Sequence, residues 1–174
     1  MNTISVAAVT AGGKTTVVRE LSKRLDNSQP LHFDDYTFGG GVEDFSQWVR
    51  GGADYQVWDL TPLKEDILKL RAEGACDWLI LDYPFAYCHD AVREYIDTAF
   101  FIDTPLDIAL ARRILRDMGS AGAEEIREDL KTYLESARPA FLQMRKDVLP
   151  SSDYVIDGSL GVDEIVTEIL AKLA

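Results

Sequence analysis

The segment Ala8-Val9-Thr10-Ala11-Gly12-Gly13-Lys14-Thr15-Thr16 decides how the rest of the chain is interpreted. It directly follows the apolar run Ile4-Ser5-Val6-Ala7, and an amphipathic pattern begins after it at Val17. A strand, a glycine turn, a Lys-Thr pair and a helix, in that order, are typical of a phosphate-binding loop. In such a loop the backbone N–H groups turn inward, and the next helix presents its positive end. The pattern therefore predicts a site for a polyphosphate anion near the start of the chain.

The loop contains each part that a nucleoside triphosphate requires. Lys14 is expected to reach the β- and γ-phosphates, and the Thr15 hydroxyl to hold Mg²⁺. The residues expected to bind the nucleotide here are Thr10, Ala11, Gly12, Gly13, Lys14, Thr15 and Thr16. Ala8 stands where the pattern GxxxxGK[ST] has its first glycine, and a methyl group is tolerated there if the backbone needs no positive φ. A glycine-rich turn that binds nothing is the alternative, which the flanking strand and helix disfavour.

Composition and charge narrow the class of protein. A length of 174 residues predicts one domain, residues 1–174, with a substantial core. There are 18 basic and 30 acidic residues, and the net charge of −12 argues against nucleic acid or an anionic membrane as a partner. Cys76 and Cys88 match neither a disulfide framework nor a metal-binding spacing. No leader pattern and no apolar run long enough to cross a bilayer is present, so we expect a cytoplasmic protein.

Short apolar runs alternate with amphipathic segments along the chain. Strands are expected at residues 3–9, 31–33, 78–81, 98–102 and 154–156, and helices at 14–26, 43–50, 61–73, 89–96, 105–117, 123–147 and 162–173. We expect a turn at 28–30, a flexible break at 39–41, a helix cap at 103–105, and a break of the long helix at Pro139. Continuous apolar strands that alternate with helices are typical of an α/β protein whose parallel sheet is covered on both faces.

Acidic residues stand where two of these strands end. Asp34 and Asp35 follow the second strand, and Asp82 ends the strand at 78–81. Ligands of parallel sheets bind at the carboxyl ends of the strands, so these acids should converge on the phosphate-binding loop. Asp82 is expected to organise Mg²⁺, and one acid of the pair to accept a proton from a substrate hydroxyl. A helix cap and a solvated turn are the respective alternatives.

Three arginines in one helix form a second candidate cluster. Arg112 and Arg116 share a helix face, and Arg113 lies close to both. Guanidinium groups suit a transferring phosphoryl group, and Gly119 and Gly122 would let residues 112–125 close as a small lid. A solvated face paired with Asp107 or Asp117 is the alternative. Surface salt bridges are expected for Arg138 and Arg145, and structural or surface roles for His32 and His89.

Aromatic residues could form an apolar slot for the substrate. The candidates are Tyr36, Phe38, Tyr55, Trp58 and Tyr83, although aromatic side chains belong to the core by default. Trp58 is favoured, because it precedes Asp59 in a segment flanked by glycines.

With these motifs in hand, the chain resembles the uridine kinase and nicotinamide riboside kinase branch of P-loop kinases over nearly its whole length. Residues 33–36 are similar to the segment whose first Asp is the general base, here Asp34. Trp58-Asp59 is similar to the segment in which an aromatic ring and an Asp hold the nucleoside. The segment 81–84 occupies the place of a Glu-Gly pair, 111–117 resembles the lid helix, 138–141 resembles a Lys-Pro-Ala-Phe motif, and 156–159 is similar to the loop that borders the adenine.

The resemblance implies a P-loop NTPase three-layer fold with a five-stranded parallel sheet in the order 2-3-1-4-5. It implies transfer of the ATP γ-phosphoryl group to a hydroxyl of a small metabolite, above all a nucleoside or riboside, with ATP and Mg²⁺ required. Lys14, Arg112 and Arg116 would assist catalysis by Asp34. The acceptor would contact Asp34, Asp35, Tyr36, Trp58, Asp59, Asp82 and Tyr83, and the nucleotide would contact Arg112, Asp157 and Gly158. The alternatives are a kinase of another hydroxyl compound, such as a sugar, a cofactor precursor or an antibiotic, and a non-catalytic ATP sensor.

The chain departs from this family's pattern at several positions. Ala8 replaces a loop glycine, Asp82 replaces the usual Glu, and Ala121 and Ala123 stand where uridine kinases have further lid arginines. The sequence has too few residues between Tyr36 and Trp58 for the substrate hairpin of uridine kinases.

Overall fold

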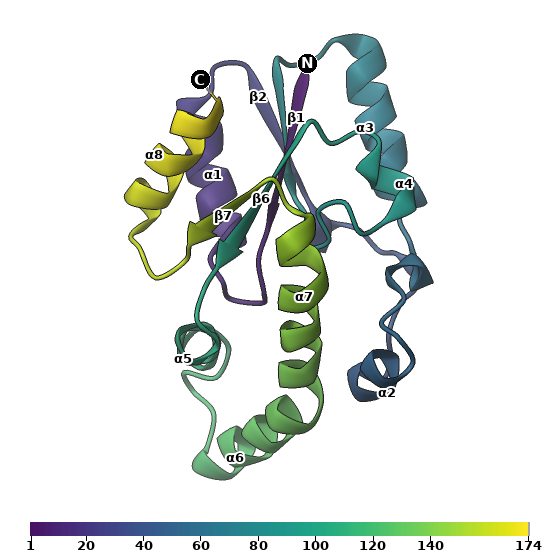
Figure 1. Cartoon of the computed structure of the whole chain (residues 1–174). Coiled ribbons are helices and arrows are strands. Elements are labelled where there is room, and N and C mark those ends of the chain that lie inside the picture. The colour runs from purple at the N-terminus through teal and green to yellow at the C-terminus, as the bar shows by residue number, and fades with distance from the viewer. Residues whose placement is uncertain (174) are drawn as a thin grey trace.

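The computed structural model describes residues 1–173 and shows a three-layer α/β fold (Figure 1). Its central sheet has five parallel strands in the order β2-β5-β1-β6-β7. They are β1 (Asn2–Ala7), β2 (Ser28–His32), β5 (Trp78–Asp82), β6 (Thr98–Asp103) and β7 (Tyr154–Asp157). Numbered along the chain, this order is 2-3-1-4-5, which confirms the predicted topology. Because every neighbouring pair is parallel, all five carboxyl ends lie at one edge of the sheet.

Helices cover both faces of the sheet. On one face lie α1 (Lys14–Arg24) and α8 (Val162–Leu173), and on the other lie α3 (Thr61–Glu73), α4 (Asp90–Arg93) and α7 (Arg138–Ser151). Successive strand residues point to opposite faces, so Leu79 belongs to the core under α3 and Ile80 to the core under α1. The helices α2 (Phe45–Arg50), α5 (Leu106–Asp117) and α6 (Ala123–Thr132) lie beyond the carboxyl edge (Figure 1).

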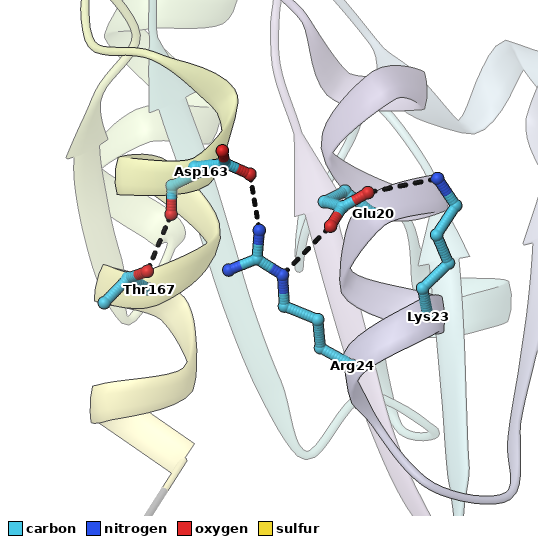
Figure 2. A network of polar contacts seen from close by, with 5 residues as sticks. All are labelled: Glu20, Lys23, Arg24, Asp163 and Thr167. Atoms are coloured by element: carbon cyan, nitrogen blue, oxygen red, sulfur yellow. Dashed lines mark hydrogen bonds and ion pairs between the residues drawn. The ribbon is translucent and has the colours of Figure 1, made fainter.

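Polar side chains join α1 to α8 at the surface (Figure 2). Arg24 donates from Nε to Glu20 in its own helix at 3.0 Å and from Nη2 to Asp163 of α8. Lys23 pairs with the same Glu20 at 3.1 Å. Exposed pairs of this kind stabilise a fold little, so the apolar residues between the two helices hold them together.

The structure corrects two predictions before residue 60. Residues 28–30 are not a turn: they begin β2, and Pro30 is tolerated because β2 is an edge strand. The predicted break at 39–41 contains β3 (Gly39–Gly40), which pairs antiparallel with β4 (Trp58–Asp59). A Cβ at Gly40 would lie 2.2 Å from the carbonyl oxygen of Val57, so only glycine allows this pairing.

Helix boundaries differ from the prediction at three places. α5 begins at Leu106 with no side-chain cap, so residues 103–105 do not cap it as predicted. Residues 133–137 form a π-helical turn that leads into α7 at Arg138, so Pro139 begins a helix and does not break one. The helix predicted at 89–96 is limited to α4. In the part of the chain that the structure describes, none of the helices combines the length and apolarity needed to cross a membrane.

Candidate active site

The loop after β1 has the backbone that an anion site requires. Ala11 and Gly13 have φ values of 58° and 98°, and a Cβ at Gly12 would lie 2.8 Å from the Val9 carbonyl oxygen. Ala8 is buried and is not among the residues with positive φ, so its methyl group is accommodated as the sequence analysis required. No side chain caps the first turn of α1, which leaves its amides available for phosphate oxygens.

A cavity of about 600 Å³ opens beside this loop. Its volume is ordinary for a small-molecule site, for which about 300–1,000 Å³ is typical. One part is polar and contains the loop residues Thr10–Thr16 together with Asp34, Arg112 and Arg116. A second part, which we call the aromatic chamber, is lined by Phe33, Phe45, Trp48, Tyr55, Trp58, Phe85, Phe141 and Met144. A third part is lined by Leu160, Val162 and Ile165 near the start of α8.

The carboxylate of Asp82 is shared by two basic side chains. One oxygen pairs with Lys14 Nζ, and the other lies 2.8 Å from His32 Nδ1. Burial raises the pKa of Asp82, but the charge of Lys14 and hydrogen bonds with Lys14, His32 and Thr15 outweigh it and hold the pKa below its usual value. Asp82 is 1% exposed, so it reaches the cavity only through Lys14 and Thr15. The role of His32 as its partner was missed, because nothing in the sequence links residues 32 and 82.

Thr15 and Asp82 offer oxygen ligands of the kind that Mg²⁺ prefers, and Thr15 is among the groups that lower the pKa of Asp82. Residues 1–173 contain no group of three or more His, Cys, Asp or Glu side chains suited to an ion. This pair fits a metal that keeps waters and brings phosphate oxygens with it, which is how Mg²⁺ is usually bound.

The side chains of the adjacent residues Asp34 and Asp35 point in different directions. Both lie in the 3₁₀ turn Phe33–Asp35 that follows β2, but only Asp34 lines the cavity. Arg116 also lines the cavity. Its hydrogen bond with the neighbouring Asp117 raises the pKa of Arg116, and the negative charge of Asp34 adds to that effect. Asp34 and Arg116 therefore both line the cavity, close enough for their charges to interact.

The three arginines of α5 have different neighbours. Arg112 lies at the loop, with Nη1 3.9 Å from the position of a Cβ at Gly13. Arg113 turns away: its Nη1 donates to Asp129 of α6 at 3.0 Å, and its guanidinium lies over the ring of Tyr133. The cavity is thus lined by Arg112 and Arg116, as the pattern indicated, while Arg113 joins α5 to α6.

Five residues predicted at the acceptor lie outside the cavity lining, namely Asp35, Tyr36, Asp59, Asp82 and Tyr83. The Tyr36 hydroxyl donates to Asp66 at 2.8 Å, and Asp59 accepts from the Thr61 hydroxyl at 2.6 Å. Tyr83 is fully buried and packs against Phe33 and Phe85, because the residue after β5 points into the core.

The loop at Asp157-Gly158 also lies outside the lining, yet it contacts residues that position the phosphate-binding loop. Asp157 accepts hydrogen bonds from Ser159 at 2.8 and 2.7 Å. A Cβ at Gly158 would lie 2.0 Å from Thr104 Oγ1, and that hydroxyl donates to the carbonyl oxygen of Gly12 at 2.7 Å. This loop, the segment between β6 and α5, and the phosphate-binding loop are therefore packed together through Thr104.

Most of the aromatic chamber was missed by the sequence analysis, which had named only Tyr55 and Trp58 among its members. Phe45 and Trp48 are spaced i, i+3 on α2, and Phe141 and Met144 have the same spacing on α7, which was the available signal. Phe33 and Phe85 come from two other segments, and nothing in the sequence links them to these helices.

The sheet order, the phosphate-binding loop and the acids and arginines around it define the class of P-loop kinases. Solved structures agree at the level of fold. A shikimate kinase from Bacteroides thetaiotaomicron has a TM-score of 0.59 at 11% identity and covers 99% of this chain and 98% of its own. A deoxyadenosine kinase from M. mycoides with bound dATP has a TM-score of 0.58 at 16% identity, with 98% of each chain covered.

Sequence relatives narrow the class. No profile of a known protein family matches the chain. A uridine kinase of Shewanella pealeana is 35% identical in an alignment that covers 96% of this chain and 92% of that protein. Uridine-cytidine kinase B of Dictyostelium discoideum is 27% identical, with 98% and 82% covered. A chloroplastic uridine/cytidine kinase of Arabidopsis thaliana is 30% identical, and the chain spans 41% of its length. The chain belongs to the uridine kinase family, a family of small-molecule kinases.

Proposed function

We propose that this protein transfers the γ-phosphoryl group of ATP, as its Mg²⁺ complex, to a hydroxyl group of a nucleoside or riboside. One observation carries the proposal: the phosphate-binding loop, the carboxylate of Asp34 and an aromatic chamber share a single cavity. The loop is complementary to phosphates, Asp34 to a hydroxyl group that loses its proton, and the aromatic chamber to a flat apolar group. The names of the relatives support a nucleoside as the acceptor.

Each residue near the loop has a role in this proposal. The amides of the loop and of the first turn of α1 bind the triphosphate. Lys14 moves away from Asp82 and pairs with the β- and γ-phosphate oxygens. Thr15 and Asp82 would hold Mg²⁺, which neutralises charge on the phosphates when it is bound. Arg112 and Arg116 offset the charge that develops on the transferring group. Leu160, Val162 and Ile165 offer an apolar surface for the adenine, next to Asp157-Gly158.

Asp34 is the base in this proposal. The acceptor oxygen forms a bond to the γ-phosphorus while the bond from that phosphorus to the bridging oxygen of ADP breaks. The proton of the acceptor hydroxyl passes to the Asp34 carboxylate. Residues 112–125 would close over the phosphates within the single domain.

An assay of ADP release with Mg²⁺·ATP and a panel of hydroxyl compounds tests the proposal. The panel contains ribosides, sugars and non-nucleoside alcohols, and phosphorus NMR identifies the product. We expect a riboside monophosphate as the product. If ADP were released only when a sugar is the acceptor, the acceptor class would be a sugar. Tight ATP binding with no ADP release in the presence of any compound would indicate a nucleotide sensor.

A further inference from the structure

Six rings of the aromatic chamber form a continuous set, and they come from separate parts of the chain, namely Phe33, Phe45, Trp48, Tyr55, Trp58 and Phe85. Trp58 and Phe85 have ring centroids 4.7 Å apart at an angle of 39°, and Tyr55 and Phe85 lie 5.4 Å apart. Trp48 of α2 meets Trp58 edge to face at 5.8 Å. Phe33 adds a further ring at 5.5 Å from Phe85. Contacts on several sides restrict how far any one ring can move, so the chamber is preformed.

The polar atoms of these rings are directed into the protein. Trp48 Nε1 donates to the carbonyl oxygen of Asp54 at 2.8 Å. The Tyr55 hydroxyl lies 3.4 Å from Asp147 Oδ2. Trp58 Nε1 lies 3.4 Å from the position of a Cβ at Gly41, so that edge of the indole faces the backbone near β3. The rings thus offer their faces and carbon edges to the cavity.

The other polar side chains of the lining already have roles with the phosphates or at the reacting hydroxyl. They are the loop residues around Lys14, together with Asp34, Arg112 and Arg116. Within residues 1–173 the lining includes no Asn, Gln, Ser, His or Glu side chain. Those side chains are the usual partners of the alternating donors and acceptors on the edge of a nucleobase.

We infer that the chamber recognises the heterocycle of its acceptor by ring stacking, with no side chain reading the hydrogen-bonding edge of the base. This inference rests on the proposed function. A site that pairs with a polar edge rejects analogues lacking that edge by about 10⁴-fold or more, because its own buried groups are left unpaired. A stack of apolar rings has no such penalty, and every flat base has a π-face. The acceptor class is therefore a flat heterocycle attached to a ribose. The donors and acceptors on the edge of the heterocycle do not affect its recognition by side chains.

Two uridine analogues separate stacking from edge recognition. 3-Methyluridine keeps a flat ring but loses the N3 donor, whereas 5,6-dihydrouridine keeps the N3 donor and both carbonyls but loses the planar ring. We expect kcat/KM for 3-methyluridine within about tenfold of that for uridine, and a larger loss for dihydrouridine. The opposite order, with uridine and dihydrouridine turned over and 3-methyluridine rejected, would overturn the inference and leave the proposed function intact. No phosphorylation of any riboside would overturn both.

Variants of Trp58 provide a second measurement. Trp58→Leu removes a stacking face, and Trp58→Phe keeps one. We expect Trp58→Leu to raise KM for uridine at least tenfold with KM for ATP within twofold, and Trp58→Phe to recover most of the loss. A Trp58→Leu protein that folds, as judged by circular dichroism, and keeps the KM of the unchanged protein would contradict the inference. The analogue comparison requires no substitution, so it decides the matter if Trp58→Leu does not fold.

Discussion

His32 Nδ1 at the end of β2 lies 2.8 Å from Asp82 Oδ2 at the end of β5, while Lys14 holds the other oxygen of the same carboxylate. Both strands end at the same edge, and His32 and Asp82 are directly paired in register. The carboxylate is thus fixed from two sides before any nucleotide binds. When Lys14 turns to the phosphates in the proposed mechanism, His32 still holds Asp82 in place beside Thr15.

Because of Asp82, the free energy of unfolding should depend on pH in the acid range. Its pKa is lowered in the folded protein, so its contribution to the free energy of unfolding is present above the unfolded value of about 3.9 and is lost as the pH falls through the folded pKa. Asp82→Asn should cost about 1–3 kcal/mol at neutral pH, because Lys14 loses its charged partner. Urea unfolding from pH 7 to pH 2 should show that the difference in the free energy of unfolding between the unchanged protein and Asp82→Asn shrinks below pH about 4. A gap that is constant with pH would contradict this assignment, and Asp26→Asn at the exposed surface is the control.

Lys14→Ala should weaken binding of Mg²⁺·ATP about 10–150-fold, since hydrogen bonds to charged groups contribute about 1.5–3 kcal/mol. Isothermal titration calorimetry measures the loss directly. Lys23→Ala is the matched control, because Lys23 belongs to the same helix and pairs with Glu20 at the surface. Equal affinities for ATP in the unchanged protein and Lys14→Ala would remove the phosphate site from this loop.

The neighbouring acids Asp34 and Asp35 provide a matched pair. Asp34→Asn should lower kcat about 10²–10⁴-fold while ATP still binds, because the variant cannot accept the proton of the acceptor. Asp35→Asn should stay close to the unchanged protein, since Asp35 is exposed and lies outside the cavity lining. Steady-state ADP release measures both. If Asp34→Asn kept full turnover, another group would have to be the base.

Arg112 and Arg113 should differ in the property they affect. Arg112→Ala is expected to lower kcat about 10²-fold or more, since it removes a charge beside the transferring phosphoryl group. Arg113→Ala is expected to lower the melting temperature, because Arg113 joins α5 to Asp129 of α6. Kinetics and thermal unfolding of both variants distinguish the roles. An unchanged kcat in Arg112→Ala would exclude it from catalysis.

Gly158→Ala should destabilise the protein by about 1–3 kcal/mol, because its methyl group would overlap Thr104. The displaced Thr104 hydroxyl would also lose its bond to Gly12, so the affinity for ATP should fall. Gly122→Ala is the control, since a Cβ there meets nothing within 4 Å. Thermal unfolding and ATP titration of both variants test this link, which would be refuted by equal stability and affinity.

The sequence by itself determined the phosphate-binding loop, the five parallel strands and their order, because loop chemistry and apolar runs are local and the family resemblance supplies the topology. It also determined which helix presents arginines, since Arg112 and Arg116 share a face. Only the tertiary structure decided that Asp34 and not Asp35 lines the cavity, that Tyr83 is buried, and that His32 holds Asp82. It also decided the aromatic chamber, whose rings come from segments up to about a hundred residues apart. Such contacts depend on how the strands and helices pack, and no periodicity along the chain records that packing.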